Sequence, residues 1–178
     1  MGFVEMPESG APNFERGFGL RPDVYRAWQG LNETIKAHAD LRRHEVATLA
    51  AAKRLRSSYC ALAHGKVLAE QFYDPDAIAA FPEGLPPEDR AVVAFAERIV
   101  DDAFSITQAD VDELRGHGLT DEDIVNVVLA VTARCFFSKT LDALGVEPDA
   151  SFAELPTALR EALTVGRPIE QQPHQHLS

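Results

Sequence analysis

The chain has 178 residues, of which 46% are hydrophobic and 25% are charged, and its formal net charge is -11 at pH 7. A chain of this length and composition can bury a core without cross-links, so we expect one soluble globular domain. The negative charge disfavours nucleic acid and anionic membranes as partners, because both attract basic surfaces. The longest apolar runs, at 91–96 and 127–133, are shorter than the ~20 residues that a membrane-spanning helix needs.

The cysteine content indicates a reducing compartment. Cys60 and Cys135 are too few for the disulfide framework of a small secreted protein. The first ten residues contain neither the basic cluster nor the apolar run of a signal peptide. We therefore expect a cytoplasmic protein in which a free thiol can remain reactive.

Residues 1–21 are rich in Pro, Gly and Glu, and we interpret them as an extended N-terminal arm whose aromatic side chains dock on the body or on a neighbouring subunit. A helical domain is expected over 22–165. Its first helix begins at Pro22, and an apolar stripe repeats every three or four residues along it. That stripe consists of Val24, Trp28, Leu31 and Ile35.

The next two helices form the centre of the sequence. One is expected over 41–56, with alanines that allow close helix approach. Ser57 and Ser58 are suited to capping the helix that follows, which carries Tyr59, Cys60 and His64.

The second half of the domain continues the helical pattern. Thr107 and Asp110, and likewise Thr120 and Asp123, have the spacing of capping boxes at helix starts. The second box opens the longest predicted helix, which Gly145 ends. No segment combines the alternation of a strand with turn residues, so the predicted fold is all-α. Residues 166–178, which include His174 and His176, are expected to form a flexible or partner-docked tail without a metal site.

Three chemically distinct side chains occur in the stretch 44–68. Cys60 and His64 are four residues apart and therefore share one face of a helix. A thiol near a helix start and beside an imidazole is suited to forming a thiolate. Glu45, on the preceding helix, can orient or charge that imidazole. At ~1.5 Å per residue, Glu45 and His64 still lie about 6 Å apart along a helical hairpin, a gap for side-chain reach, helix tilt or a water to close.

This stretch resembles the core of the AhpD-like alkylhydroperoxidases in the carboxymuconolactone decarboxylase superfamily. Their pattern is Glu, eleven residues, Cys-x-x-Cys, three residues, His, and here Glu45 is followed after eleven residues by Ser57-Ser-Tyr-Cys60 and then by His64. The segments 18–27, 119–124 and 141–148 are similar to the lead-in helix and closing part of the peroxidase-related subgroup. The resemblance covers about residues 15–150 and implies an AhpD-like helical bundle.

The resemblance also implies roles for individual residues. Cys60 corresponds to the peroxide-reactive thiol, His64 to the histidine that assists its deprotonation, and Glu45 to the carboxylate of the same proton relay. Tyr59 matches a common neighbour of the thiol. Ser57 replaces the family's other cysteine, so a local disulfide cannot form, and Ser57 is left with a supporting role.

The loss of that cysteine leaves the recycling of the thiol open. A sulfenic acid formed at Cys60 must condense with a second thiol. The candidates are Cys135, a thiol on another subunit, or a small external thiol. Cys135 is also readily explained as a packed residue of its apolar helix.

Simpler interpretations exist for each of these residues. A cysteine on an Ala-rich helix is often a small core residue, and a nearby histidine is often structural. His44 is offset by about 100° from Glu45 on the helix, which favours a surface position. Cys60, His64 and Glu45 supply at most three mixed ligands, so zinc is disfavoured and no metal or other cofactor is expected.

The sequence therefore favours a cofactor-free, antioxidant peroxidase-like oxidoreductase. Its substrates would be an organic hydroperoxide or hydrogen peroxide and an external thiol reductant. Two alternatives remain: a carboxymuconolactone decarboxylase-like lyase without thiol chemistry, and a non-catalytic, redox-responsive protein. A homo-oligomer (dimer, trimer or hexamer) is expected, because family members assemble through helical faces and the Ala-rich helices suit such packing.

Overall fold

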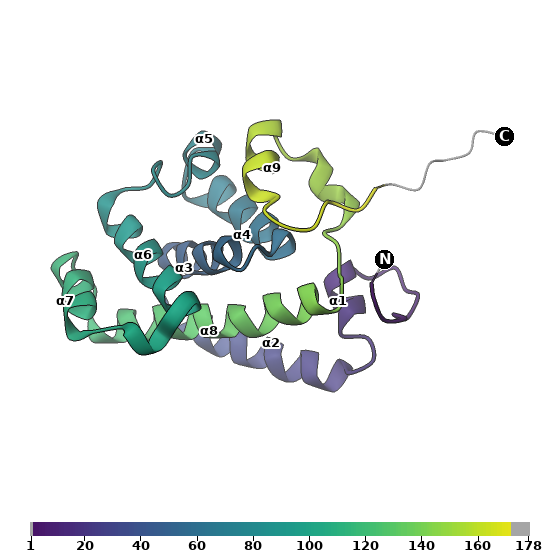
Figure 1. The fold of residues 1–178 in the computed structure, drawn as a ribbon, viewed down its shortest axis with the longest axis horizontal. Helices are drawn as coiled ribbons and strands as arrows, with labels where there is room; N and C mark the ends of the chain where they lie inside the picture. Colours follow the sequence, from purple (N-terminus) through teal and green to yellow (C-terminus); the bar gives the residue numbers. More distant parts are fainter. Residues whose placement is uncertain (1, 172–178) are drawn as a thin grey trace.

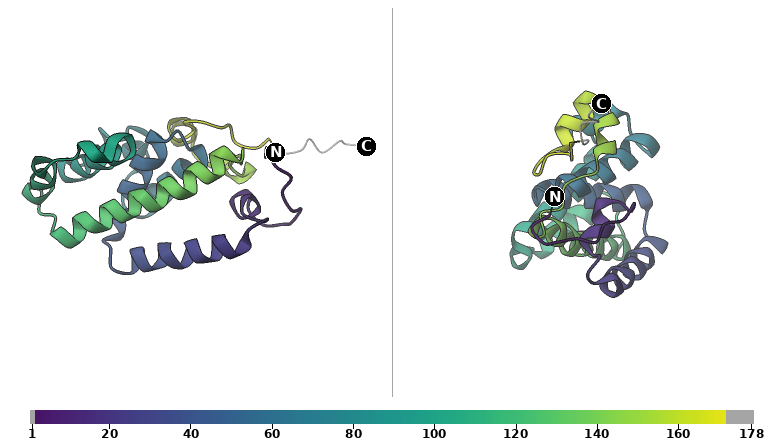
Figure 2. Two further views of the ribbon diagram at one scale, coloured as in Figure 1. Left: turned by 60° about the horizontal axis from the view of Figure 1, so that its bottom comes forward. Right: turned by 90° about the vertical axis from the view of Figure 1, so that its right-hand side faces the viewer.

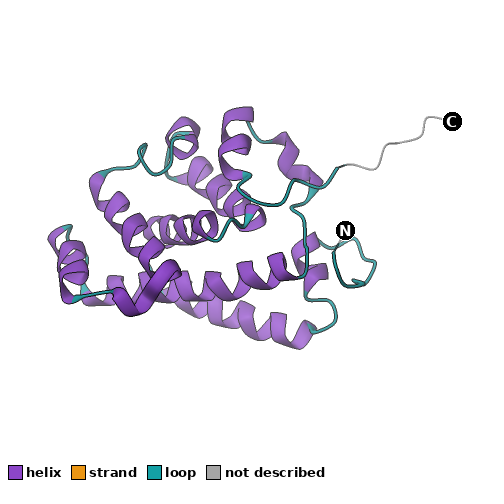
Figure 3. Cartoon of the chain, in the orientation of Figure 1, coloured by secondary structure: helices purple, strands orange, loops and turns teal. Residues whose placement is uncertain are grey.

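The computed structural model describes residues 2–171, and all regular structure in that part of the chain is helical (Figures 1 and 3). The prediction of an all-α fold is confirmed. The elements in chain order are α1 (Asn13–Gly17), α2 (Pro22–Ala37), α3 (Leu41–Arg54), α4 (Ser58–Gln71), α5 (Pro75–Ala79), α6 (Pro87–Asp102), η1 (Ala103–Ser105), α7 (Gln108–Gly116), α8 (Asp121–Ala143), η2 (Ala150–Glu154) and α9 (Thr157–Leu163).

Helix α3 lies at the centre of the bundle. It packs against α4, α6 and α8, and every residue from His44 to Ala52 is buried. A helix that is covered on all sides needs small side chains where its neighbours come close. Ala47, Ala50, Ala51 and Ala52 meet that need, and all four are fully buried. The Ala-rich face therefore packs within the chain and is not free to form a subunit interface.

The long helix α8 runs the length of the molecule, and α2 lies along its outer side (Figures 1 and 2). By length and composition alone α8 would pass for a membrane span, but half of its apolar window is buried inside the molecule. A core helix meets the same criteria. Both predicted capping boxes are present, at the start of α7 and at the start of α8. Gly145 adopts a positive φ of 74° directly after α8.

The two ends of the described chain both pack on this bundle. Phe18 of the N-terminal arm is 5% exposed, and its ring stacks on Phe137 of α8. At the other end, the Gly166 amide donates to Ser58 Oγ at 2.7 Å, and the Glu170 amide donates to the Pro148 carbonyl at 2.8 Å. The first residues of the predicted tail thus lie on the body, whereas His174 and His176 fall outside the described residues.

Candidate functional site

Glu45 and His64 are in direct contact. Glu45 Oε2 of α3 and His64 Nδ1 of α4 are 2.5 Å apart, so side-chain reach alone closes the gap that the sequence left. Burial raises the pKa of Glu45, but the hydrogen bond and charge of His64, together with Lys36, outweigh burial and hold the pKa at about 2. Glu45 is therefore a carboxylate at neutral pH. It accepts a hydrogen bond from the Nδ1–H group of His64, which leaves His64 Nε2 as the free acceptor.

Lys36 completes this pair from helix α2. Its Nζ lies 2.9 Å from Glu45 Oε1, so each oxygen of the buried carboxylate has a partner. The Lys36 side chain is 35% exposed, whereas that of Glu45 is 4% exposed. Lys36 is thus in contact both with the buried Glu45 carboxylate and with solvent. Lys36 was not predicted as a site residue, because a lysine on an amphipathic helix belongs to no motif.

Cys60 is the third residue of α4 and is 1% exposed. Helix N-termini favour negative charge, and the position suits a thiolate. The hydrogen-bond contact to its sulfur comes from α8, where Arg134 Nη1 lies 3.5 Å from Cys60 Sγ. A guanidinium at this distance attracts a thiolate more strongly than a thiol. Arg134 was not predicted, since 74 residues separate it from Cys60 and only the fold brings the two together.

His64 is poised as a neutral base. Burial and the nearby charge of Arg134 lower the pKa of His64, and the contact with Glu45 only partly opposes this. A neutral imidazole has a free nitrogen that can take up a proton. His64 and Cys60 line the same cavity, as the sequence spacing predicts.

The cavity beside Cys60 has a volume of about 280 Å³, and five of its twelve lining residues are Phe, Tyr or Trp. Its lining residues come from α1, α2, α4 and α8, and include Phe14, Tyr25, Trp28, Tyr59, Arg134 and Phe137. Trp28 stacks on Phe137 with ring centroids 4.2 Å apart. We call this space the Cys60 cavity. None of its aromatic residues except Tyr59 was assigned to the site from the sequence.

Tyr59 lines the Cys60 cavity and also fastens the N-terminal arm. Its hydroxyl donates a hydrogen bond to Asp149. The same carboxylate accepts a hydrogen bond of 2.8 Å from the backbone amide of Asn13. Burial is the larger cause that raises the pKa of Tyr59, and the contact with Asp149 raises it further. The tyrosine therefore remains protonated and acts through its ring and its hydrogen bond.

Ser57 occupies the N-cap position of α4, but its hydroxyl does not cap the helix. The side chain is fully buried, and its hydroxyl has no hydrogen-bond partner among residues 2–171. It lies near enough to the Asp142 carboxylate of α8 to oppose, in part, the rise that burial causes in the pKa of Asp142. The local serine–helix pattern does not reveal that this hydroxyl is buried without capping the helix.

Cys135 is half-buried on α8, and both cysteines are free. Burial raises the pKa of the Cys135 thiol, against the opposing charges of Lys139 and Arg134. Cys135 does not line the Cys60 cavity.

His44 is not a surface residue, in contrast to the prediction. It is 3% exposed, because α3 is buried on all sides and an angular offset from Glu45 does not lead to solvent. Burial lowers the pKa of His44 to about 4.

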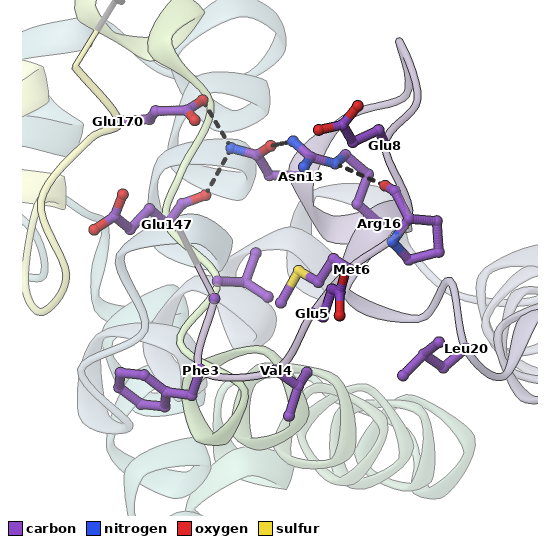
Figure 4. Close-up of a pocket in the computed structure, with 13 residues that line it drawn as sticks. Phe3, Val4, Glu5, Met6, Glu8, Asn13, Arg16, Leu20, Glu147 and Glu170 are labelled. Atoms are coloured by element: carbon purple, nitrogen blue, oxygen red, sulfur yellow. Dashed lines mark hydrogen bonds between the residues drawn. The ribbon is translucent and has the colours of Figure 1, made fainter.

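A larger cavity of about 960 Å³ lies between the N-terminal arm and the segments around Val146 and Glu170 (Figure 4). Its side chains are mostly apolar or carboxylate, and Arg16 is engaged with Asn13 and the Pro7 carbonyl. It contains no thiol or imidazole, so the smaller Cys60 cavity is the candidate site. Within residues 2–171, no group of three or more His, Cys, Asp or Glu side chains is arranged to hold a metal ion.

The sequence matches no protein-family model and no curated protein, but solved structures resemble it. A peroxidase-related protein with an alkylhydroperoxidase AhpD core from Ralstonia eutropha JMP134 is 22% identical, covering 85% of this chain and 94% of that chain, with a TM-score of 0.76. A peroxidase-related protein from Silicibacter sp. TM1040 is 19% identical over 80% and 79% of the two chains, with a TM-score of 0.71.

The chain has the AhpD-like fold. A third structure with this fold is the debrominase Bmp8, 17% identical over 85% of this chain and 83% of that chain, with a TM-score of 0.70. A variant of that debrominase has been solved in complex with 2,3,4-tribromopyrrole. The AhpD-like fold thus occurs in proteins described as peroxidase-related and in a debrominase.

Proposed function

We propose that this chain is a thiol-dependent, peroxidase-like oxidoreductase of the AhpD-like superfamily, in which Cys60 reduces an organic hydroperoxide or hydrogen peroxide. One observation carries the proposal. The Cys60 sulfur lies at a helix N-terminus, beside the Arg134 guanidinium, and shares a cavity with His64, which is paired with Glu45. This arrangement supplies a thiol, a cation that stabilises the thiolate, and a base oriented by a carboxylate.

The first step follows from these roles. His64 Nε2 takes the thiol proton, and the thiolate attacks the terminal oxygen of the peroxide. A sulfur–oxygen bond forms, the oxygen–oxygen bond breaks, and the other oxygen leaves with the bonding electron pair. His64 returns its proton to that oxygen, which yields an alcohol, or water when the substrate is hydrogen peroxide. Cys60 is left as a sulfenic acid.

Recycling requires two further thiols. The first condenses with the sulfenic acid to give a disulfide and water, and the second reduces that disulfide and restores Cys60. Ser57 cannot perform the first of these steps. The raised pKa of Cys135 disfavours its thiolate, and Cys135 lies outside the Cys60 cavity. An external thiol is therefore our preferred reductant, with Cys135 as the alternative.

The test is multiple-turnover reduction of tert-butyl hydroperoxide and hydrogen peroxide with a defined thiol donor. We expect Cys60→Ala to abolish peroxide consumption. If an external thiol resolves the sulfenic acid, Cys135→Ala retains turnover; if Cys135 resolves it, turnover is lost. Peroxide reduction by Cys60→Ala at the wild-type rate would overturn the proposal.

The same assay separates the alternatives that the sequence left open. One stoichiometric oxidation of Cys60 without recycling would indicate a redox-responsive protein. A lyase without thiol chemistry would release carbon dioxide from a carboxylated lactone equally well after Cys60→Ala.

The aromatic lining of the Cys60 cavity favours one further candidate, reductive dehalogenation of a halogenated aromatic compound. The debrominase with the same fold motivates this candidate. In such a reaction a carbon–hydrogen bond replaces the carbon–halogen bond, and two thiols supply two electrons and leave as a disulfide. The halide departs together with a proton. Release of bromide from a bromophenol, with a thiol donor and wild-type protein but not with Cys60→Ala, would support this activity over peroxide reduction.

A further inference from the structure

Arg134 is a buried cation without a carboxylate partner. The residue is 4% exposed, and among residues 2–171 no Asp or Glu forms an ion pair with it. Its guanidinium carbon lies 5.6 Å from the Trp28 ring centre and 5.1 Å from that of Phe137. Aromatic faces stabilise a cation only in part, and a buried charge is costly until an anion balances it.

Two anions can balance this charge from within the Cys60 cavity. One is the Cys60 thiolate, whose sulfur is 3.5 Å from Nη1. The other is an anionic group on a bound ligand, because Arg134 is itself part of the cavity lining. A guanidinium has five N–H donors, so one contact with sulfur leaves others for a second acceptor.

One side of the cavity fits a flat ring, while Gln29, Asn32 and Glu33 of α2 add polar groups to the lining. Phe14 of α1, Tyr25 and Trp28 of α2, and Phe137 of α8 form an aromatic wall. Ring centroids within this wall are 4.2 to 6.4 Å apart, the spacing at which aromatic rings attract one another. A volume of about 280 Å³ is near the lower end of small-molecule pockets, which suits a ligand with a single ring.

We propose that the Cys60 cavity binds an aromatic substrate that carries an anionic oxygen, such as a carboxylate or a phenolate, with the ring against the aromatic wall and the anion on Arg134. The inference deepens the proposed function, on which it rests for the use of this cavity as the substrate site. It applies equally to a hydroperoxide on an aromatic acid and to a halogenated phenolate, since both present a ring and an anionic oxygen.

The other charges of the site are consistent with this assignment. Glu45 is occupied by His64 and Lys36, so it neither pairs with Arg134 nor leaves Lys36 free for a ligand. Glu33 also lines the cavity, but it is exposed, and water screens its repulsion of an anion. Arg134 is therefore the cation that a ligand inside the cavity would meet.

The test uses unreactive probes, so it does not depend on turnover. Trp28 is the sole tryptophan of the chain and lines the cavity, and its fluorescence reports on binding. We expect benzoate to bind wild-type protein about tenfold more tightly than benzamide, which lacks the charge, and more tightly than cyclohexanecarboxylate, which lacks the aromatic ring. Bound benzoate should also slow the alkylation of Cys60 by iodoacetamide.

Three variants sharpen the assignment. Arg134→Met should abolish the preference for benzoate over benzamide, whereas Lys139→Met, an exposed cation one turn further along α8, should leave it unchanged. Glu33→Gln should strengthen benzoate binding modestly by removing the repulsion at the rim. The comparison of ligands on the wild-type chain holds even if Arg134→Met fails to fold.

Equal binding of benzoate and benzamide by the wild-type chain, or no protection of Cys60, would overturn the inference. Its failure is distinguishable from that of the proposed function. Peroxide turnover without a preference for benzoate would refute the inference alone, and selective benzoate binding without thiol-dependent turnover would refute the proposed function alone.

Discussion

His44 shows how a single buried side chain couples the stability of this fold to pH. The histidine lies on the central helix, and burial holds its pKa at about 4 in the folded chain, against an ordinary value of 6.5. As the pH falls from 6.5 towards 4, the unfolded chain binds a proton that folded His44 excludes. Folding stability is therefore lost across this window, by about 3 kcal/mol in total. His64, whose pKa is also lowered, adds loss of the same sign.

We predict that His44→Leu reduces this acid sensitivity. When the pH falls from 7 to 5, the free energy of unfolding should decrease by about 2 kcal/mol less in the variant than in the wild type. Urea unfolding at the two pH values measures the difference. His117→Asn, at an exposed histidine after α7, is the matched control and should leave the pH dependence unchanged. If the free energy of unfolding of His44→Leu depends on pH as strongly as that of the wild type, His44 does not remain neutral in the folded chain.

Lys36 forms an ion pair with the buried Glu45 carboxylate, so mutation of Lys36 should change the pKa of Glu45. Its removal leaves Glu45 Oε1 without its cation, and the pKa of Glu45 should rise from about 2. We predict that Lys36→Met shifts the acid limb of Cys60 alkylation by iodoacetamide to higher pH, while the rate on the alkaline side changes little. Lys66→Met removes an exposed pair with Glu70 and serves as the control. Identical profiles for wild type and Lys36→Met would show that Lys36 has no influence on the pair.

At the residue scale, the sequence predicts the contacts that lie within one helical hairpin. The spacing of Cys60 and His64 places them on one face of a helix, whereas the contact between Glu45 and His64 needed the structure to close the last few ångströms. Helical spacing within one hairpin does not predict that Arg134 and the aromatic wall belong to the site. They reach the site only through the packing of α2 and α8, and a buried arginine in an apolar helix has no local signature.

At the element scale, Asp149 links α1 to the site. Its carboxylate accepts hydrogen bonds from the backbone amide of Asn13, at the start of α1, and from the Tyr59 hydroxyl of α4. The Asn13 side chain adds contacts with the Glu147 carbonyl and with Glu170. Phe14 lines the Cys60 cavity, with its ring edge-on to Tyr59 at 5.7 Å. The arm therefore contributes one wall of the cavity, and Asp149 is one of the contacts that position it.

We predict that Asp149→Ala loosens α1, because it removes both hydrogen bonds at once. Amide hydrogen exchange over residues 13–18 should become faster, and alkylation of Cys60 should speed up as Phe14 moves away. Tyr59→Phe removes one of the two bonds and keeps the ring, so its effect should be smaller. If the two variants behave identically, the Asn13 contact does not hold the arm.

The helices themselves are the part of the fold that sequence reasoning predicts well. Capping boxes at Thr107 and Thr120 are local signals, and the structure contains both. The Ser57 hydroxyl shows the limit of local signals, since a residue that suits a cap occupies the N-cap position without forming the capping hydrogen bond. The alanines of α3 show the same limit, because their pattern does not indicate whether the facing helix belongs to the same chain or to another.

At the scale of the whole molecule, the alanines of α3 are buried within the chain, and we propose an exposed apolar strip on α8 as the surface for a homo-oligomer. Val125, Leu129 and Phe136 are 54%, 40% and 46% exposed and recur at helical spacings on one face. Large apolar side chains gathered on one face of a helix favour association, since contact removes them from water. A second copy of the chain presents the same strip, and pairing about a twofold axis would bury both.

We predict that the full chain sediments as a dimer or larger assembly and that Phe136→Asp shifts it towards the monomer, because a carboxylate would be buried in the interface. Sedimentation velocity over a range of concentrations measures the shift. Phe104→Asp is the matched control: Phe104 is 98% exposed on η1 and does not belong to the α8 strip, so the same charge there should leave assembly unchanged. A wild-type chain that remains monomeric at all concentrations would contradict the prediction, and equal effects of the two substitutions would remove α8 as the interface.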